Sequence, residues 1–535
     1  MHSNFHRTAS TIAVLAFLFA GSAHAASNVT VDDTGDTAIN DGLCNLREAI
    51  TAANNQVNFD GCLFSGSGSP TTITFAIGSG LQTIDVGSQL PPITVPVIID
   101  GLSQPGASCT TWPPTLEIQV SSPSNGQFNG LTLNPGSDGS TIRGLVINGF
   151  NNNQGYAYNF NAAINIYQSA GNHIECNFLG TDPTGGTAMP NLRGVDINTA
   201  NNNVIGSDGS AKPYFVRNLI SGNTYGQVDT RGNALSGNII AGNYIGTDAA
   251  GNVAMGNQGS ANGVEINANP GPASGNYVGW NGSGDPVLMR NVISGFTGTT
   301  YAGVNMTVGA YANVVAGNYI GTDATGTKAI PNFFGIELGS NSNVYGNVIG
   351  NLGAQNPASA RNVISGNSFT GVDINAANGT HDNAVIGNYI GMDATGAPLG
   401  NGQYGISMDY ASANTLVARN WIAGQGTAIR FFGSGSFGGG STASFINNSA
   451  GGNTSLPALD SRDNCVLGGT GVLVYAQGAN VPNPNIFANN WWGAGTGPNT
   501  SGASSADGSI AATPFLTVPA AACDDTIFRN GFEAP

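Results

Sequence analysis

The stretch Arg361-Asn362-Val363-Ile364-Ser365-Gly366-Asn367, followed by Gly371-Val372-Asp373-Ile374, decides the fold because the chain keeps repeating it. Arg-Asn followed by two apolar residues, then Ser or Ala, then Gly starts at positions 217, 290, 361 and 419. A second phrase, Asn-aromatic-aliphatic-Gly, starts at 177, 243, 318 and 388, which gives spacings of 66, 75 and 70 residues. Repeats of this length indicate a solenoid.

A short strand signal of the form Gly-Val-x-Ile lies inside each repeating unit. Its second and fourth positions are apolar and its third is polar, as expected for a strand with one buried face. Successive copies lie 31 to 40 residues apart, so each unit contains two coils. The signal starts at Gly194, Gly263, Gly303, Gly335, Gly371 and Gly405, with looser versions at Ala163 and Gln227.

The composition agrees with a fold made of such strands. The intervening Asn, Gly and Ser form tight turns, and the segments are too short and too rich in β-branched residues for helices. Gly accounts for 80 of 535 residues, and only 8% of residues are charged although 40% are hydrophobic. Strands that pair with their successors one coil later must run parallel. The sequence therefore predicts an all-β chain folded as a parallel β-helix.

The first 25 residues have the features of a signal peptide. His6 and Arg7 form a basic start, Thr11–Ala20 is apolar, and Ala23-His24-Ala25 is a small-residue cleavage site. The apolar run is too short to span a bilayer, and no other stretch approaches 18 apolar residues. We therefore expect an exported protein without a transmembrane segment, secreted or held at the outer cell surface.

The segment from Leu43 to Asn54 has apolar residues at helical spacing, and it is the one convincing amphipathic helix in the sequence. The first coil of a solenoid exposes an open core and an unpaired strand edge, which must be covered for solubility. We therefore predict a helical N-terminal cap, followed by first strands at Thr71–Phe75 and Thr94–Ile99 and a turn at Ile99–Gly106.

Six cysteines follow the predicted cleavage site, in an oxidising setting where disulfides persist. Fifteen connectivities are possible. Short separations favour Cys44 with Cys62, and Cys465 with Cys523 at the C-terminal end, which leaves Cys109 and Cys176 as the third pair. A metal site is the rival interpretation, but the sequence has no Cys-x-x-Cys and few histidines.

The chain is strongly acidic, with a formal net charge of −16 and only two lysines, Lys212 and Lys328. Such a surface repels nucleic acids and anionic lipids. Binding of an acidic polysaccharide would need bridging cations. No cofactor is expected, and calcium is possible.

Several of these motifs together resemble exported bacterial β-helix proteins of the pectin-lyase-like class. Cys44–Asn54 resembles their Cys-Ser-Leu-Arg-Glu-Ala segment, with Asn45 in place of the usual Ser, and Thr141–Ile147 and the two repeated phrases resemble the same group. Asn489-Asn490-Trp491-Trp492-Gly493 resembles the last coil of many such proteins. The resemblance implies a right-handed helix, as does the general rule for parallel crossovers. It implies little about function, since the class contains lyases, hydrolases, adhesins and passive stalks.

The expected organisation has five parts. They are a signal peptide at 1–25, an N-terminal cap with the first strands at 26–100, β-helix repeats at 101–488, a C-terminal coil or cap at 489–520, and a tail at 521–535. The tail resembles a C-terminal segment of other exported bacterial proteins, a recognition tag for export or anchoring. A last edge strand that covers the final coil is the alternative.

The polar third position of each strand signal predicts a column on the outside of one sheet, with neighbours ~4.8 Å apart. Its members are Asn165, Asp196, Asp229, Glu265, Asn305, Glu337, Asp373, Ser407 and Arg430. The candidate catalytic residues are its acids, Asp196, Asp229, Glu265, Glu337 and Asp373. Adjacent or next-but-one coils could supply the carboxyl pair of a glycosidase. The alternative, a solvated polar face that keeps the sheet from pairing with others, is favoured.

Other repeated residues have structural interpretations. Asp182, Asp248, Asp323 and Asp393 recur every second coil, too far apart to share a calcium ion, and are expected to form Asx-turns. Phe178, Tyr244, Tyr319 and Tyr389 are expected to pack under an adjacent loop rather than to stack on sugars. The Asn residues of the two phrases are expected to form side-chain ladders, and His173 and His381 are expected in surface or turn positions.

Two functional hypotheses follow. The first is a non-catalytic exported β-helix that acts as an adhesin, a matrix component or a polysaccharide binder. The second is a polysaccharide lyase or glycoside hydrolase that uses the acidic column. The sequence has no Gly-His-Gly, no Arg-Ile-Lys and no paired Asn-Thr-Asp and Asp-Asp motifs, and its Lys and His are few. These absences favour the first hypothesis, with a polysaccharide or cell-surface glycan as partner.

Overall fold

The computed structural model describes residues 26–432, with gaps at 124–126, 152–160, 213, 256–260, 340–343, 351–357, 377–379, 411–414, 419, 423 and 425–426. Beyond residue 432 it describes the short strands at 465–466, 472–477, 485–486, 505–506 and 510–511. The predicted signal peptide, the Trp491-Trp492 motif and the tail at 521–535 lie outside these residues.

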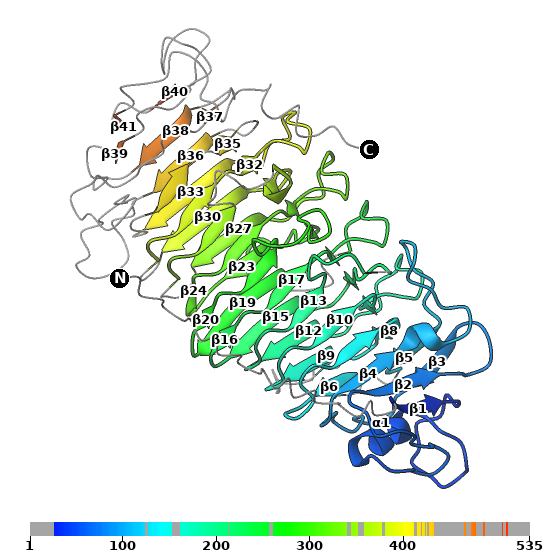
Figure 1. Ribbon diagram of the computed structural model, residues 1–535. Coiled ribbons are helices and arrows are strands. Elements are labelled where there is room, and N and C mark those ends of the chain that lie inside the picture. Colours follow the sequence, from blue (N-terminus) through cyan, green and yellow to red (C-terminus); the bar gives the residue numbers. More distant parts are fainter. Residues whose placement is uncertain are drawn as a thin grey trace, which may run out of the picture.

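Three long parallel sheets run the length of the molecule, and each has 12 strands (Figure 1). Sheet 1 contains β1 (Ser27–Val31), β2 (Thr71–Phe75), β4 (Val97–Asp100), β7 (Thr141–Arg143), β10 (His173–Glu175), β13 (Val204–Gly206), β17 (Ile239–Ala241), β21 (Tyr277–Gly279), β25 (Val314–Ala316), β28 (Val348–Gly350), β31 (Ala384–Ile386) and β34 (Leu416–Ala418).

Sheet 2 contains β3 (Gln82–Asp85), β5 (Ile118–Ser121), β8 (Leu145–Asn148), β11 (Phe178–Leu179), β14 (Leu219–Ile220), β18 (Tyr244–Ile245), β22 (Val292–Ile293), β26 (Tyr319–Ile320), β29 (Val363–Ile364), β32 (Tyr389–Ile390), β35 (Trp421–Ile422) and β37 (Cys465–Val466). Sheet 3 contains β6 (Leu131–Leu133), β9 (Ala162–Tyr167), β12 (Arg193–Asn198), β15 (Gly226–Gly232), β19 (Asn262–Pro270), β23 (Ala302–Met306), β27 (Phe334–Gly339), β30 (Thr370–Ala376), β33 (Tyr404–Tyr410), β36 (Thr427–Phe432), β38 (Val472–Gln477) and β40 (Ser505–Ala506).

Smaller elements complete the fold. A three-stranded sheet joins β16 (Leu235–Ser236), β20 (Ala273–Ser274) and β24 (Ala310–Tyr311), and β39 (Asn485–Ile486) pairs with β41 (Ile510–Ala511). Two short 3-10 helices are η1 (Gly101–Ser103), within the predicted turn, and η2 (Ala358–Ala360).

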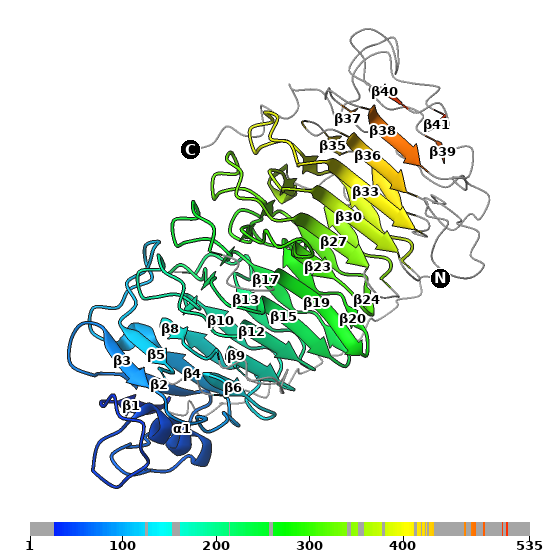
Figure 2. The same ribbon diagram turned by 180° about the vertical axis from the view of Figure 1, so that it is seen from behind.

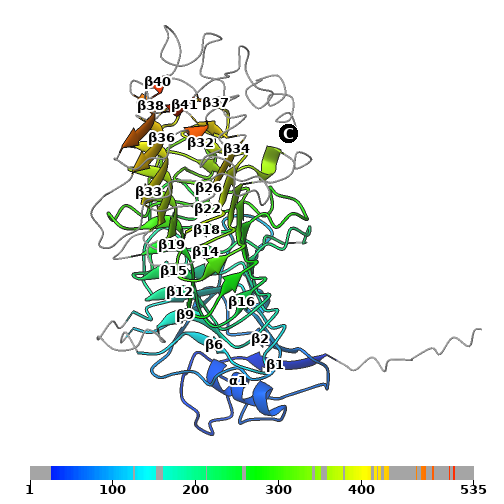
Figure 3. The same cartoon turned by 90° about the vertical axis from the view of Figure 1, so that its left-hand side faces the viewer.

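The chain visits the three sheets in the same order in each coil, and every strand pairs in parallel with the strand one coil later. The fold is therefore a right-handed parallel β-helix, as predicted, and the stack of coils is clear from behind and from the side (Figures 2 and 3). A single hydrophobic cluster of mainly Val, Ile and Leu fills its interior from β1 to β36.

The Gly of each strand signal is required by close approach between coils. A Cβ added to Gly303 would lie 2.8 Å from the carbonyl oxygen of Gly335 and 3.1 Å from a methyl carbon of the interior Ile320. Side chains of any size are excluded there. The polar residue two positions later is left to point outward.

The N-terminal end carries the only α-helix among the described residues, α1 (Leu46–Asn55). Asn45 caps it: its side chain accepts a hydrogen bond from the Glu48 backbone N–H, and the Glu48 carboxylate accepts one from the Asn45 N–H. The helix contacts β1 and β2 at the end of the stack (Figure 1). Its protection of the open end against association stays a prediction. Strand β1, which precedes the helix and pairs with β2, was not predicted from the sequence.

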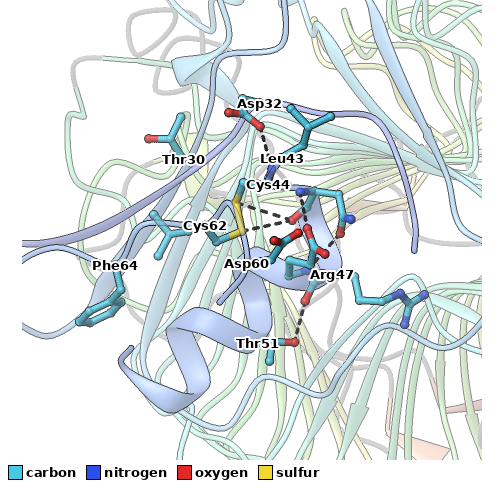
Figure 4. Close-up of a disulfide and its surroundings, with 12 residues drawn as sticks. Thr30, Asp32, Leu43, Cys44, Arg47, Thr51, Asp60, Cys62 and Phe64 are labelled. Carbon is cyan, nitrogen blue, oxygen red and sulfur yellow. Dashed lines mark hydrogen bonds between the residues drawn. A yellow bond between two sulfur atoms is a disulfide. The ribbon is translucent and has the colours of Figure 1, made fainter. Parts of the chain in front are cut away.

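Two of the three predicted disulfides are present. Cys44 and Cys62 are joined beside α1, with their Cα atoms 4.6 Å apart (Figure 4). Cys109 and Cys176 are also joined, with Cα atoms 6.5 Å apart. Cys523 lies outside the described residues, so its pairing with Cys465 stays a prediction. No helix in the described part of the chain is long and apolar enough to cross a membrane.

Candidate functional site

The predicted column exists on sheet 3, and its register confirms that its members lie in successive coils. Asp196 pairs with Asp229, Asp229 with Glu265, and Glu265 with Asn305. The column continues through Glu337, Asp373, Ser407 and Arg430. All five candidate acids therefore share one face, and the strands β12, β15, β19, β27 and β30 position them. We call this row the acidic column.

The acidic column is not the solvated face that the sequence analysis expected. The exposed fraction is 1% for Asp196, 5% for Asp229, 8% for Glu337 and 4% for Asp373, and Glu265 alone among these acids is partly exposed. Strand alternation fixes the direction of a side chain. It does not fix what lies over it, and here side chains from neighbouring strands cover part of the column.

Arginines neutralise the first two acids. Arg193 Nε donates to Asp229 Oδ2 at 2.6 Å, and Arg231 Nε donates to Asp196 Oδ1 at 2.6 Å. The pairs cross between β12 and β15, and the Arg193 guanidinium also lies over the Tyr225 ring, 4.3 Å from its centroid. Replacing Asp229 by Asn would therefore remove the ion pair with Arg193.

Glu265 and Glu337 have a different environment. Glu265 accepts hydrogen bonds from the side-chain amides of Asn262, at 3.1 Å, and Asn267, at 3.0 Å. Among the described residues, neither Glu265 nor Glu337 forms an ion pair with a basic side chain. Burial, followed by the nearby Glu265 charge, raises the pKa of Glu337 to about 7. Burial also raises the pKa of Asp229 to about 7, because it outweighs the opposing charge of Arg193.

Unpartnered acceptor atoms lie along the same column. Asn165 Oδ1, Asp229 Oδ1 and Asn305 Oδ1 are buried and have no hydrogen-bond partner in the part of the chain that the structure describes. Asn305 stands between Glu265 and Glu337 in the register. A buried acceptor without a donor is costly. These positions therefore favour a ligand that brings donors.

A cluster of aromatic rings lies beside the column and was missed by the sequence analysis. We call Phe333, Phe334, Phe369 and Tyr404 the ring cluster. The Phe333 and Phe369 rings are stacked with centroids 4.9 Å apart, and Phe334 and Tyr404 meet the Phe369 ring edge-on. All four side chains are half-buried. An aromatic residue directly before the strand-signal Gly, as in Phe334-Gly335 and Tyr404-Gly405, was the available clue.

The four repeated aspartates form the predicted turns. Asp182 Oδ1 accepts from the backbone N–H groups of Gly186 and Thr187, both at 3.0 Å. Asp248, Asp323 and Asp393 make equivalent bonds in their own loops. These loops stack on one another through backbone hydrogen bonds such as Ala249 N–H to Gly185 O, at 3.0 Å. Their role is structural.

The aromatic row on sheet 2 packs as predicted. Phe178 is fully buried and Tyr244, Tyr319 and Tyr389 are each at most 9% exposed, in one cluster with the loop residues above them. The Arg of the first phrase lies over the Tyr of the second: Arg217, Arg290 and Arg361 lie 4.2, 4.4 and 4.1 Å from the ring centroids of Tyr244, Tyr319 and Tyr389. Both repeated phrases are thus explained by packing.

Asparagine ladders are also confirmed. The two phrases contribute alternately to one ladder, in which each side-chain amide donates to the next Asn Oδ1: Asn177, Asn218, Asn243, Asn291, Asn318, Asn362, Asn388 and Asn420. A second ladder, not foreseen, comprises Asn172, Asn203, Asn238, Asn276, Asn313, Asn347 and Asn383.

The two histidines differ. His381 forms an isolated parallel bridge with Tyr345 and has an exposed side chain, in line with the expected surface position. Its ring stacks on Tyr345 with centroids 4.9 Å apart. His173 instead belongs to strand β10, where its Nδ1 lies 3.4 Å from Glu175 Oε1. Glu175 also accepts hydrogen bonds from Lys212 and from the Tyr214 hydroxyl. Burial raises the pKa of Glu175, but the opposing effects of His173, Lys212 and Tyr214 together lower it. This cluster fastens the loop that contains Lys212 to sheet 1.

Calcium was a possible ligand of the acidic column. In the described ranges, no three or more His, Cys, Asp or Glu side chains are grouped so that they could hold a metal ion. Binding of calcium by the acidic column stays a prediction.

Comparisons with known proteins give no family and only distant structural likenesses. No family model matches the chain, and no curated protein matches it. The A-module of the mannuronan C-5 epimerase AlgE4 from Azotobacter vinelandii is 12% identical, with 82% of this chain and 98% of that chain covered and a TM-score of 0.35. PfbA, a surface adhesin of Streptococcus pneumoniae, is 12% identical, with 85% and 93% covered and a TM-score of 0.34.

The pectate lyase Pel9A is 10% identical, with 83% of this chain and 80% of that chain covered and a TM-score of 0.23. The similar structures therefore include a mannuronan C-5 epimerase, a pectate lyase and a surface adhesin. Identities and TM-scores this low carry no functional argument. The function has to be argued from the site itself.

Proposed function

We propose that this protein binds a polysaccharide along the outward face of sheet 3. The observation that carries the proposal is the ring cluster beside a row of polar acceptors on one straight face. Aromatic rings stack on the C–H faces of sugar rings, and carboxylate and amide oxygens accept hydrogen bonds from sugar hydroxyls. Repetition of both features from coil to coil suits a ligand that is itself a repeating chain.

A binding screen tests this proposal. The purified protein is titrated with soluble oligosaccharides of neutral, acidic and amine-bearing sugars, and affinity is measured by calorimetry. Phe334→Ala and Phe369→Ala should each weaken binding about tenfold, the loss expected from one good stacking contact. Phe215→Ala, which removes an exposed ring from a loop on another face, is the matched control. Equal affinity of all variants would place the ligand elsewhere.

Glycoside hydrolysis is the second candidate, and the pKa values favour it over lyase chemistry. Asp229 and Glu337 each have a pKa of about 7. Asp229 pairs directly with Glu265 in the register, and Glu337 lies two strands from Glu265, beyond Asn305. Adjacent strands hold carboxyls ~4.8 Å apart and next-but-one strands ~10 Å apart. These separations are near those of retaining and inverting glycosidases, about 5–5.5 and 6.5–9.5 Å. Release of reducing ends from a bound polymer, abolished by Glu265→Gln, is the measurement that supports hydrolysis.

Export completes the proposal. We infer from the predicted signal peptide that the mature protein starts near Ala26 and works outside the cytoplasm, in contact with extracellular or cell-surface glycans. Mass spectrometry of the protein recovered from culture medium and from cell fractions tests this. Recovery of intact Met1 in the cytoplasmic fraction would contradict it.

A further inference from the structure

The part of the acidic column between β19 and β27 lacks positive charge. Glu265, Asn305 and Glu337 occupy successive strands there, over about two strand spacings, or ~10 Å. No basic side chain in the described ranges pairs with either glutamate. Asn305 is 8% exposed, and its Oδ1 is buried without a partner. In the part of the chain that the structure describes, Asn305 Oδ1 is the buried acceptor without a donor, and the two Glu265 oxygens each accept one amide hydrogen bond, from Asn262 and Asn267.

A ligand that satisfies these atoms must bring donors and positive charge together. A buried carboxylate that is neither paired nor bridged holds its proton more tightly than an exposed one, and a nearby negative charge adds to this effect. The raised pKa of Glu337 has this cause, with burial first and the Glu265 charge second. A cationic ligand would replace the proton. A neutral ligand would leave the charge unbalanced, and an anionic one would add to it.

The distance between the acids of the column indicates which kind of cation could bind there. Glu265 and Glu337 lie two strand spacings apart, ~10 Å, whereas two ligands of one calcium ion span only about 5 Å. No group of three or more His, Cys, Asp or Glu that could hold a metal ion is present in the described ranges. An ammonium group has three N–H donors and reaches acceptors at about 2.8 Å. A row of ammonium groups along a chain fits a row of acceptors along the sheet.

The adjacent rings identify what carries the ammonium groups. Phe334 stands three residues before Glu337 on strand β27, and Phe333 and Phe369 continue the ring cluster toward β30. Such rings accept sugar C–H faces, and they also attract cations over their own faces. Acceptors and rings side by side therefore favour a sugar that carries an amine.

We propose that this stretch of sheet 3 binds an amine-bearing polysaccharide, a polymer of 2-amino-2-deoxy sugars, with its ammonium groups against Glu265, Asn305 and Glu337 and its sugar rings on the ring cluster. The inference rests on the proposed function and deepens it by naming the class of glycan. Uronate polymers, which the acidic surface repels, are disfavoured.

Three oligosaccharide series of equal length test the proposal with the full protein: de-N-acetylated glucosamine, N-acetylated glucosamine and galacturonate. The assay is run at a pH at which the amines are charged. The de-N-acetylated series should bind at least about tenfold more tightly than the N-acetylated one, the value of one charge-assisted contact. Raising the salt concentration should reduce that preference.

Glu337→Gln keeps the shape and removes the charge, so it should weaken binding of the amine series about tenfold and reduce N-acetylated binding much less, which narrows the preference for the amine. Asp85→Asn, which removes an exposed acid on β3 of sheet 2, should change neither. Calorimetry of the wild-type protein in buffers of different ionisation enthalpy adds a readout that needs no variant. Binding of the amine should release protons from the column.

The outcomes separate the two levels of the argument. Equal binding of the amine and N-acetylated series, or tighter binding of galacturonate, would overturn the amine inference and leave polysaccharide binding intact. Polylysine that binds as tightly as the amine series would show selection for charge alone and would also overturn it. Absence of binding to every glycan would overturn both proposals.

Discussion

The two halves of the acidic column follow the same backbone pattern but solve the problem of buried charge differently. In β12 and β15 the acids Asp196 and Asp229 are paired with Arg231 and Arg193. From β19 to β27 the glutamates have only amide partners or none that is ionic in the described ranges. The difference shows that a repeated strand signal sets position, whereas the residues around it decide whether a position is structural or available to a ligand.

The part of the acidic column on β12 and β15, which contains the two ion pairs, should lose more stability on mutation than the rest. The Arg193 and Asp229 side chains are 4% and 7% exposed. Removal of one partner from a buried ion pair leaves the other charge buried without a counter-charge. Arg193→Met should therefore lower the free energy of unfolding by about 4 kcal/mol at a pH at which Asp229 is ionised. Urea unfolding followed by circular dichroism measures this. Arg193→Lys, which keeps the charge, should recover part of the loss, and an unaffected Met variant would contradict the pairing.

The part of the acidic column from β19 to β27 should respond to mutation in the opposite direction: loss of a carboxylate there should raise the free energy of unfolding, by an amount that depends on pH. The pKa of Glu337 rises from an unfolded value of about 4.3 to about 7. Between these values the folded protein holds a proton that the unfolded chain has released, so its stability falls as pH rises and is lowest above the folded pKa. Glu337→Gln has no carboxyl group to ionise, so this fall in the free energy of unfolding should be absent from the variant.

The expected gain for Glu337→Gln is up to roughly 3 kcal/mol near pH 8 and close to zero near pH 4. Unfolding curves of both proteins across this range give the measurement. A variant that is less stable than wild type near pH 8 would mean that the Glu337 carboxylate has a partner, and would break the comparison between the halves.

Asparagines sharpen the comparison further. Asn318 belongs to the first ladder: its amide donates to Asn362 Oδ1 at 3.1 Å and to Val278 O at 2.8 Å. Asn318→Ala should cost about 2 kcal/mol, because it leaves buried ladder groups unpaired. Asn305→Ala removes an oxygen that has no partner, so it should cost less while weakening glycan binding. Equal costs at the two sites would remove the distinction between ladder and column.

The smallest expected effect lies outside the column and provides a control for stability alone. Asn45→Ala deletes the reciprocal cap of α1 and should cost about 1 kcal/mol. Since α1 is remote from β19 and β27 (Figure 1), glycan affinity should not change. A parallel loss of affinity would show that binding follows global stability, and the variants of the acidic column would then need reinterpretation.

The sequence alone determined the architecture of the protein. The alternation in Gly-Val-Asp-Ile has a period of two, and its recurrence one coil later puts like residues in register, so Asp196 and Asp229 had to be neighbours. The Asx-turns of Asp182 and its equivalents are local, and Cys44 and Cys62 are close in sequence. Features set by local geometry, or by exact repetition, can be read from the chain.

Tertiary structure decided what the acidic column can do. Long side chains such as Arg193 and Arg231 reach across strands, and the repeat contains no signal for their targets. The ring cluster comes together because residues 333, 334, 369 and 404 lie at or directly before the first residues of strands that stack, although they are up to 71 residues apart in the sequence. Burial, and with it the raised pKa of Glu337, depends on everything packed around the carboxyl. These ion pairs, ring contacts and buried carboxyl groups form only when the coils stack.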